Sequence, residues 1–281
     1  MKIEVKKPEN LIKFVIHNIQ GLSFAKAQKL LRKGDIKVNN KRTKENISLV
    51  VGDIVDVYYF ETSKPKVDII YEDDNILIVN KPQGIECATR DKSSDNTYSL
   101  EEIFEEKNAI IVHRLDRLTE GLVILAKNKD IARLFETYFK SKKIIKKYLA
   151  GVYGEPKVQG VHTAYWKKNE KTATVEISNT PTPDFKEIVT EFYTYSKTDT
   201  YSILDVTLHT GRTHQIRAHL GHLGHPIIND NKYGNNYRDK FDYKGYFLTA
   251  YSLSFRLDGK MEYLNNMTFE IKPSWSLDQL N

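Results

Sequence analysis

The sequence has few of the features that mark secreted or membrane proteins. Its only cysteine is Cys87, so no disulfide can form within the chain, which favours a reducing compartment. A lone cysteine is more often a buried small residue than a nucleophile. Residues 1–10 lack the apolar core of a signal peptide, and no run approaches the roughly 20 apolar residues of a membrane span. We therefore expect a cytoplasmic protein that does not enter a membrane.

The chain also lacks internal repeats, heptads and low-complexity tracts. Hydrophobic residues make up 40% and charged residues 28%, a balance typical of globular proteins rather than disordered ones. Its 281 residues suffice for one large domain and one small one. The net charge of +6 suits a polyanionic partner such as nucleic acid, although a basic protein without such a partner has the same composition.

Basic residues are concentrated near the N-terminus, where residues 26–44 contain a single acid, Asp35. A helix is predicted from an N-cap at Ser23 to a stop at Gly34. A strand at 36–38 and a polar turn at 39–41 follow. The basic side chains of the helix and turn then form one candidate RNA-binding surface, or an ordinary solvated face: Lys26, Lys29, Arg32, Lys33, Lys37, Lys41 and Arg42.

The chain divides into two predicted domains. Residues 1–60 form the small N-terminal α/β domain, the polar stretch 61–68 reads as a linker, and residues 69–281 form the second domain. Beyond the linker, short apolar runs outnumber helical patterns. This predicts an α+β fold with a mainly antiparallel mixed sheet and flanking helices, among them 130–139 and 214–223.

The segment "IIVHRLDRLTEGLVILAK", residues 110–127, contains the densest chemical information. Asp116 lies between two apolar strands, with Gly121 permitting a turn before the second, and so at the rim of a core. Its flanking residues Arg114 and Arg117 would keep it ionised and thus nucleophilic. A structural Asp–Arg pair at a turn is the alternative. A kinase catalytic loop is excluded, because no glycine-rich loop precedes the segment and no asparagine follows at the required spacing.

This segment resembles the signature of the RluA-type family of pseudouridine synthases, H-R-L-D-x-x-T-S-G followed by an apolar strand. Other stretches resemble further motifs of the family in the expected order: "YEDDNILIVNKPQGI", "KKYLAGVYG", "TGRTHQIRAHLGHLGHPIINDNKYG" and "FLTAYSLSF". Ahead of them, "GLSFAKAQKLLRKGDIKVNNKR" resembles the S4 RNA-binding domain. Together the resemblance extends from Leu11 to Phe255.

The resemblance implies a pseudouridine synthase fold and the isomerisation of uridine in structured RNA. The reaction breaks the N1 glycosidic bond and joins C5 to the same ribose, which requires neither cofactor nor metal. It gives the nucleophile's role to Asp116, a place beside the flipped uracil to Tyr148, and the carboxylate's basic partner to Arg217. Candidate RNA contacts complete the set: His113, Arg114, Arg212 and His214.

Two local features bear on the site. Five histidines lie in residues 209–225, with His219 and His222 one turn apart, but that window has no cysteine and only one carboxylate, Asp230. We expect hydrogen-bonding and RNA-contacting histidines there rather than a metal site. Leu118 and Glu120 depart from the family signature, and we expect them to alter local RNA contacts without touching the catalytic set.

Large-subunit (23S) ribosomal RNA is the favoured substrate, and transfer RNA is possible. The alternative is an S4-type RNA-binding or ribosome-assembly protein without catalytic activity. A hydrolase using Asp116 with His113 would need a second carboxylate or a metal in the cleft, and the sequence offers neither. A monomer with no obligate protein partner is expected. The sequence leaves open which uridine is modified, and whether Asp116 attacks the ribose or the base or assists elimination through a glycal.

Overall fold

The computed structural model describes residues 1–19, 22, 24–58, 64–88, 98–234, 241, 243 and 245–276. These fall into two compact units, residues 1–58 and the described residues from Lys64 onward. Val67 is buried in the core of the second unit. The predicted domain limits, with a linker at 61–68, stay predictions.

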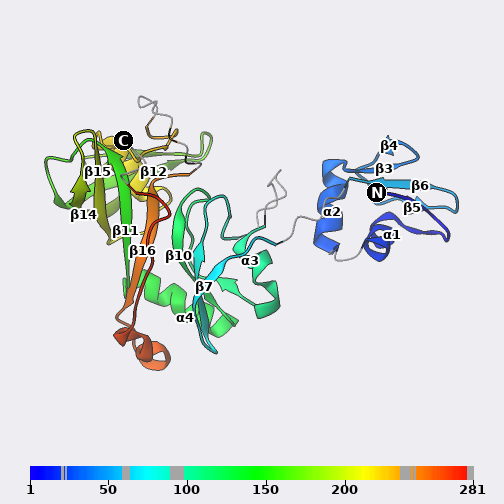
Figure 1. The fold of residues 1–281 in the computed structure, drawn as a ribbon, viewed down its shortest axis with the longest axis horizontal. Helices are drawn as coiled ribbons and strands as arrows, with labels where there is room; N and C mark the ends of the chain where they lie inside the picture. The colour runs from blue at the N-terminus through cyan, green and yellow to red at the C-terminus, as the bar shows by residue number, and fades with distance from the viewer. Residues whose placement is uncertain are drawn as a thin grey trace. The chain divides into compact units, whose positions relative to one another are not determined.

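The N-terminal unit packs two helices against a small antiparallel sheet of order β1-β6-β3-β4 (Figure 1). Its apolar core includes Leu11 and Val15 of the first helix, Leu30 and Leu31 of the second, and Val55 of the sheet. A second, two-stranded sheet pairs β2 with β5. The elements are β1 (Lys2–Glu4), β2 (Glu9–Asn10), α1 (Leu11–Asn18), α2 (Phe24–Lys33), β3 (Ile36–Val38), β4 (Lys41–Arg42), β5 (Ser48–Leu49) and β6 (Ile54–Val57).

Local predictions for this unit are confirmed where the structure describes the residues, except that Lys41, predicted in the turn, begins strand β4. Helix α2 ends at Lys33, and Gly34 follows with φ +73°, a left-handed conformation that suits glycine. Asn39 and Asn40 also have positive φ, so they form the tight turn between β3 and β4. The predicted N-cap, Ser23, lies outside the described residues.

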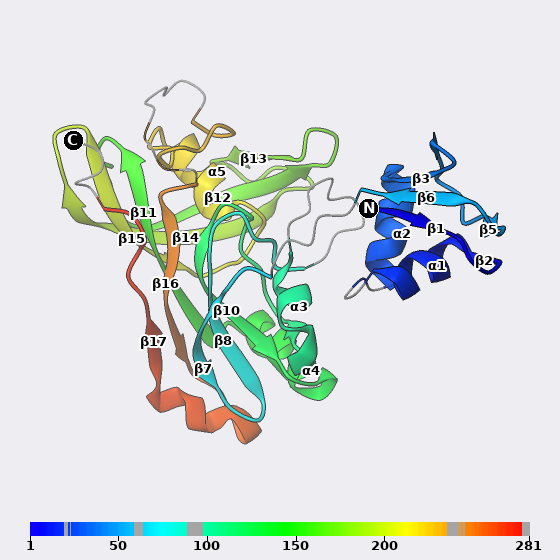
Figure 2. The ribbon, with the colours of Figure 1, turned by 45° about the vertical axis from the view of Figure 1, so that its right-hand side comes forward.

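The second unit is built on a sheet of order β13-β12-β14-β15-β11-β16-β10-β8-β7, with β17 on β16 and β9 on β10 (Figure 2). Among its described strand pairs only β10 with β16 is parallel, so the predicted α+β fold with a mainly antiparallel sheet is confirmed. The first elements are β7 (Asp68–Glu72), β8 (Ile76–Lys81), α3 (Leu100–Ile103), η1 (Glu105–Lys107), β9 (Ile110–Ile111), β10 (Glu120–Ala126), α4 (Lys129–Lys140) and β11 (Ile144–Tyr153). The remainder are β12 (Gly160–Asn169), β13 (Thr174–Ser178), β14 (Lys186–Lys197), β15 (Tyr201–Leu208), α5 (Gln215–His222), β16 (Leu248–Phe255), η2 (Gly259–Asn266) and β17 (Thr268–Glu270).

Strand β10 is apolar along almost its whole length because both of its faces are covered. Val123 and Leu125 join the core cluster that includes Ile216 of α5. Leu122 and Ile124 face the opposite cluster, which includes Phe135 of α4. A strand buried on both faces loses the usual alternation of polar and apolar residues. The loop between β9 and β10 therefore leads into a strand that is packed on both faces.

Gly121 lies within β10, where the sequence had indicated a turn. Its φ is +125°, and an added Cβ would lie 2.4 Å from the backbone oxygen of Ala250. The parallel approach of β16 thus requires glycine at this position. None of the helices that the structure describes is long and apolar enough to span a membrane.

Candidate active site

The loop between β9 and β10 carries Asp116 and is held in place by the buried side chain of Lys81. Lys81 has no exposed surface, and its Nζ donates hydrogen bonds to the carbonyl oxygens of Pro82 (3.0 Å), Ile85 (2.9 Å) and Arg117 (3.2 Å). Burial lowers the pKa of Lys81 to about 8, against the opposing effect of nearby acidic groups that include Asp116. The lysine therefore joins the Asp116 loop to the segment that follows β8.

Cys87 is buried against the same loop, as expected for a lone cysteine. Its Sγ accepts a hydrogen bond from the backbone N–H of Leu115 at 3.3 Å, and burial raises the thiol's pKa. A protonated, buried thiol is a poor nucleophile. Its place here is to support the backbone beside Asp116.

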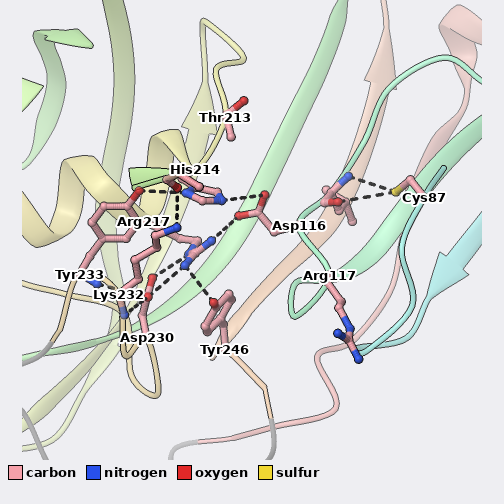
Figure 3. Close-up of polar contacts among 12 residues, drawn as sticks. Cys87, Asp116, Arg117, Thr213, His214, Arg217, Asp230, Lys232, Tyr233 and Tyr246 are labelled. Carbon is pink, nitrogen blue, oxygen red and sulfur yellow. Dashed lines mark hydrogen bonds and ion pairs between the residues drawn. The ribbon is translucent and has the colours of Figure 1, made fainter. Parts of the chain in front are cut away.

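Helix α5 brings Arg217 to Asp116. Ile216 and Leu220 are buried in the core, which turns Arg217 toward the carboxylate, as the sequence predicted. The Arg217 Nη1 donates to Asp116 Oδ2 at 2.7 Å (Figure 3). Arg114 and Arg117, the flanking residues, are both exposed, and the Nε of Arg117 donates to the carbonyl of Gly84. The cation that holds Asp116 therefore comes from a distant part of the chain.

Arg217 also binds a second carboxylate, that of Asp230. Its Nε and Nη2 donate to Asp230 Oδ2 and Oδ1 at 2.7 and 3.0 Å, and the Asp230 side chain has no exposed surface. Burial alone would lower the pKa of Arg217, but Asp230 and then Asp116 outweigh it and raise that pKa. The guanidinium is therefore permanently charged and oriented by a bidentate pair.

Two tyrosines enclose the guanidinium. The Tyr246 ring centroid lies 4.1 Å from the Cζ of Arg217, and its hydroxyl accepts from Nη2 at 2.9 Å. The Tyr233 ring lies 5.3 Å away. Cation–π contact with both rings, together with the two carboxylates, leaves Arg217 little freedom to rotate.

His214 faces Asp116 from the start of α5. It is the N-cap residue, in a left-handed conformation (φ 54°) that is uncommon for histidine. Its Nε2 lies 3.8 Å from Asp116 Oδ1, and its Nδ1 is 2.9 Å from the hydroxyl of Tyr233. Burial lowers the pKa of His214 to about 4, although the charge of Asp116 opposes the shift, so the ring is neutral at neutral pH. The backbone conformation thus directs the neutral His214 ring toward the Asp116 carboxylate. Arg212, the other candidate RNA contact near the start of α5, is exposed.

Tyr148 lies on β11, in the core cluster that also holds Leu115 and Ile216. Burial, and secondarily the charge of Asp116, raises the pKa of Tyr148. Its hydroxyl is therefore protonated at neutral pH. An active-site role for Tyr148 stays a prediction.

A cleft of about 280 Å³ opens above the Asp116–Arg217 pair. Arg114, Arg117 and Lys232 add three cationic side chains to its lining, and Leu118 and Tyr246 add apolar surface. The Asp116 side chain keeps 22% of its surface exposed. The site thus combines an accessible carboxylate with a positively charged rim, which favours an anionic ligand.

The structure does not support the predicted RNA contact for His113. Its Nε2 accepts a hydrogen bond from the backbone N–H of Ile124 at 2.9 Å, and its ring lies 4.8 Å from that of Phe139. Burial lowers its pKa to about 3, so the ring is neutral. A half-buried, neutral ring that is bonded to a strand is suited to holding the Asp116 loop against β10.

The other histidines of residues 209–225 also have separate partners. The pairs are His209 with Glu191, His219 with Thr190, His222 with Asn179, and His225 with the carbonyl of Tyr153. Among the described residues no three His, Cys, Asp or Glu side chains gather as a metal site would require. Each of these rings therefore has a local hydrogen-bonding role.

Glu120 was predicted to affect RNA contacts, and the structure shows otherwise. It is 7% exposed, and its carboxylate accepts hydrogen bonds from Thr249 and Ser274 inside the molecule. The prediction failed because β10 begins at Glu120, before Gly121 rather than after it, and so takes Glu120 into the sheet. Leu118, by contrast, lines the cleft.

Sequence reasoning also missed three residues of the site: Lys81, Asp230 and Tyr246. Lys81 was not singled out, and Asp230 was considered only as a possible metal ligand. Both lie inside stretches whose resemblance to family motifs was recognised, so the motifs could have identified them. Tyr246 has no such signal, because the contact with Arg217 depends on the fold.

Comparisons with known proteins agree with this geometry. The family described as RNA pseudouridylate synthase matches residues 75–222, more than half of the chain. A protein of Mycoplasma capricolum subsp. capricolum described as an uncharacterized RNA pseudouridine synthase is 33% identical, over 95% of each chain. The ribosomal large subunit pseudouridine synthase C of Buchnera aphidicola is 32% identical, over 90% of this chain and 87% of that relative.

The fold is likewise similar to a solved structure, that of human RNA pseudouridylate synthase domain containing 4. The TM-score is 0.60 at 21% identity, covering 75% of this chain and 92% of the human one. The sequence relatives, the family match and this fold agree. The chain therefore belongs to the RNA pseudouridylate synthase family.

Proposed function

We propose that the protein isomerises uridine to pseudouridine in large-subunit ribosomal RNA, and that Asp116 is its catalytic nucleophile. The observation that supports this most directly is the 2.7 Å ion pair between Asp116 and Arg217 at the base of an open, cationic cleft. A carboxylate held this way is charged, oriented and accessible to an extruded base.

The two oxygens of Asp116 have different surroundings. Oδ2 is held by Arg217, whereas among the described residues Oδ1 has only the neutral ring of His214, at 3.8 Å. We infer that Oδ1 is the oxygen free to attack, because a strong charge-assisted hydrogen bond lowers the reactivity of the other. Tyr148, with its protonated hydroxyl, would act by stacking or by donating a hydrogen bond rather than as a phenolate.

The target class is inferred from relatives such as the Buchnera aphidicola protein, whose name specifies the ribosomal large subunit. Pseudouridine mapping of total RNA from cells with and without the gene tests it. We expect one or more large-subunit positions to lose pseudouridine when the gene is absent and to regain it on complementation. Loss confined to transfer RNA would overturn the target. Tight RNA binding with no change at any position would favour the non-catalytic RNA-binding alternative.

We further infer that the N-terminal unit is an S4-like domain that contacts RNA through its basic surface. Lys26, Lys29, Arg32 and Lys33 come from α2, and Lys37, Lys41 and Arg42 from β3 and β4. Lys37 also donates to the hydroxyl of Tyr58 at 2.9 Å, while Arg32, Lys41 and Arg42 are exposed. Side chains of this kind displace counterions from the phosphate backbone.

Changing the three exposed members together (Arg32→Gln, Lys41→Gln, Arg42→Gln) should weaken RNA binding. We expect the slope of log affinity against log salt to fall by about 2 to 3, because up to three phosphate contacts are lost. Turnover on a minimal stem-loop should stay unchanged. The matched control replaces three exposed lysines of the second unit, Lys129, Lys140 and Lys260, with glutamine. Equal effects of both triple variants would show only a general effect of charge.

Three further proposals concern the cofactor requirement, the location and the oligomeric state. The isomerisation is redox-neutral, so we propose an enzyme that needs no cofactor or metal. Because ribosomal RNA is the proposed substrate, we propose that the protein acts in the cytoplasm. We propose a monomer without an obligate protein partner.

A further inference from the structure

Glu120, at the end of the Asp116 loop, connects that loop to the C-terminal segment, residues 272–276. Its Oε1 accepts from the Thr249 hydroxyl at 2.7 Å and the Ser274 backbone N–H at 2.9 Å. Its Oε2 accepts from the Ser274 hydroxyl at 2.5 Å, and the Tyr243 hydroxyl lies 3.5 Å away. One buried carboxylate thus gathers three hydroxyls and a backbone amide only four residues after Asp116.

The C-terminal segment is held firmly at this point. Trp275 is 4% exposed, and its indole N–H donates to the Thr249 hydroxyl at 2.9 Å. Its ring packs 5.3 Å from that of Phe247. The buried Trp275 therefore fixes the position of the adjacent Ser274, which bonds Glu120.

From Glu120 the hydrogen bonds continue toward Arg217. The Tyr243 hydroxyl is 2.9 Å from the Ser274 hydroxyl and accepts from the Gln83 Nε2 at 2.5 Å. The same Nε2 donates to the carbonyl of Tyr246 at 2.9 Å. Tyr246 in turn bonds Arg217, the partner of Asp116. The path therefore runs from Glu120 through Ser274, Tyr243 and Gln83 to Tyr246.

The direction of these bonds is fixed by the two ends. An amide N–H can only donate and a carboxylate accepts, so the Ser274 hydroxyl donates to Glu120, and the Tyr243 hydroxyl donates onward to Ser274 or Glu120. Such an ordered chain strengthens each of its members. The Gln83 amide fills the space beside Gly245, where an added Cβ would lie 1.4 Å from the Gln83 Oε1.

We propose that Glu120 is a positioning residue for catalysis, which acts with Ser274, Tyr243 and Gln83 to fix the Tyr246 ring and hydroxyl against Arg217. This rests on the role proposed above for the Asp116–Arg217 pair. None of the four residues is among the residues that line the cleft. Their effect therefore reaches the reaction through the orientation of the guanidinium.

Tyr243→Phe tests the proposal by removing one hydroxyl while keeping the ring that packs against Phe247. We expect kcat in steady-state isomerisation assays to fall about five- to tenfold, with KM and the urea midpoint nearly unchanged, because one hydrogen bond that orients Tyr246 is lost. The matched control is Tyr263→Phe, which removes a tyrosine–carboxylate hydrogen bond with Asp73, a residue outside the cleft lining. The control should keep full activity.

A double-mutant cycle with Tyr246→Phe separates positioning from general structural damage. If the hydroxyl of Tyr243 acts through Tyr246, the double variant should lose much less than the product of the two single losses. Gly245→Ala, which displaces Gln83 without removing any polar group, should reproduce the loss in kcat. Wild-type kcat in Tyr243→Phe, or fully multiplicative losses in the cycle, would overturn the proposal. Activity in an Asp116→Ala variant would instead contradict the proposed function itself.

Discussion

Replacing Asp116 with asparagine should abolish isomerisation and leave the fold intact. Asparagine keeps the shape of the side chain and an oxygen for the Arg217 Nη1 now bonded to Oδ2 at 2.7 Å, but it has no negative charge with which to attack. Release of tritium from C5-labelled uridine in RNA should fall by about a thousandfold or more, as for other variants that remove a nucleophile.

Two further measurements make this result specific. RNA affinity should stay close to that of the wild type, because the cationic rim at Arg114, Arg117 and Lys232 is unchanged. Asp184→Asn is a suitable control, since that carboxylate is exposed and its contact with Lys167 is long, at 3.8 Å. Substantial tritium release by the Asp116→Asn enzyme would exclude Asp116 as the nucleophile.

Replacing Arg217 with methionine should damage both stability and activity, for separate reasons. The change leaves Asp230, whose side chain has no exposed surface, as a buried carboxylate without its cation. Breaking a buried ion pair from one side costs about 3–5 kcal/mol, which should appear as a lower free energy of unfolding in urea. Activity should be lost as well, because Asp116 loses the donor that orients it.

A second substitution separates the two effects. Arg217→Met combined with Asp230→Asn removes the stranded charge and keeps an oxygen for the backbone N–H of Lys232. The double variant should recover most of the lost stability yet remain inactive. If Arg217→Met were as stable as the wild type, the pair with Asp230 would have no structural role. Recovery of activity in the double variant would argue against the catalytic role of Arg217.

The sequence alone singled out the side chains that we propose for the chemistry. Asp116 and Arg217 lie in motifs whose residue order is readable without a fold. The helix 214–223 was predicted as well, and in the structure Ile216 and Leu220 pack into the core while the neighbouring Arg217, also buried, reaches Asp116. The break at Gly34 followed from its conformational freedom. Such signals are local, because periodicity and turn chemistry depend on residues only a few positions apart.

Only the tertiary structure decided which partners these side chains meet. Asp116 and Arg217 are 101 positions apart, so local reasoning pointed to the flanking arginines, and only the family resemblance indicated Arg217 as the cation that the fold brings to Asp116. His113 and Glu120 were predicted to affect RNA contacts, whereas the fold gives both internal hydrogen bonds and buries Glu120. The parallel pairing of β10 with β16 sets Gly121 against Ala250, and Thr249 beside Glu120. Strand order is a property of the whole chain, since it depends on which distant apolar faces cover one another, and no local pattern encodes it.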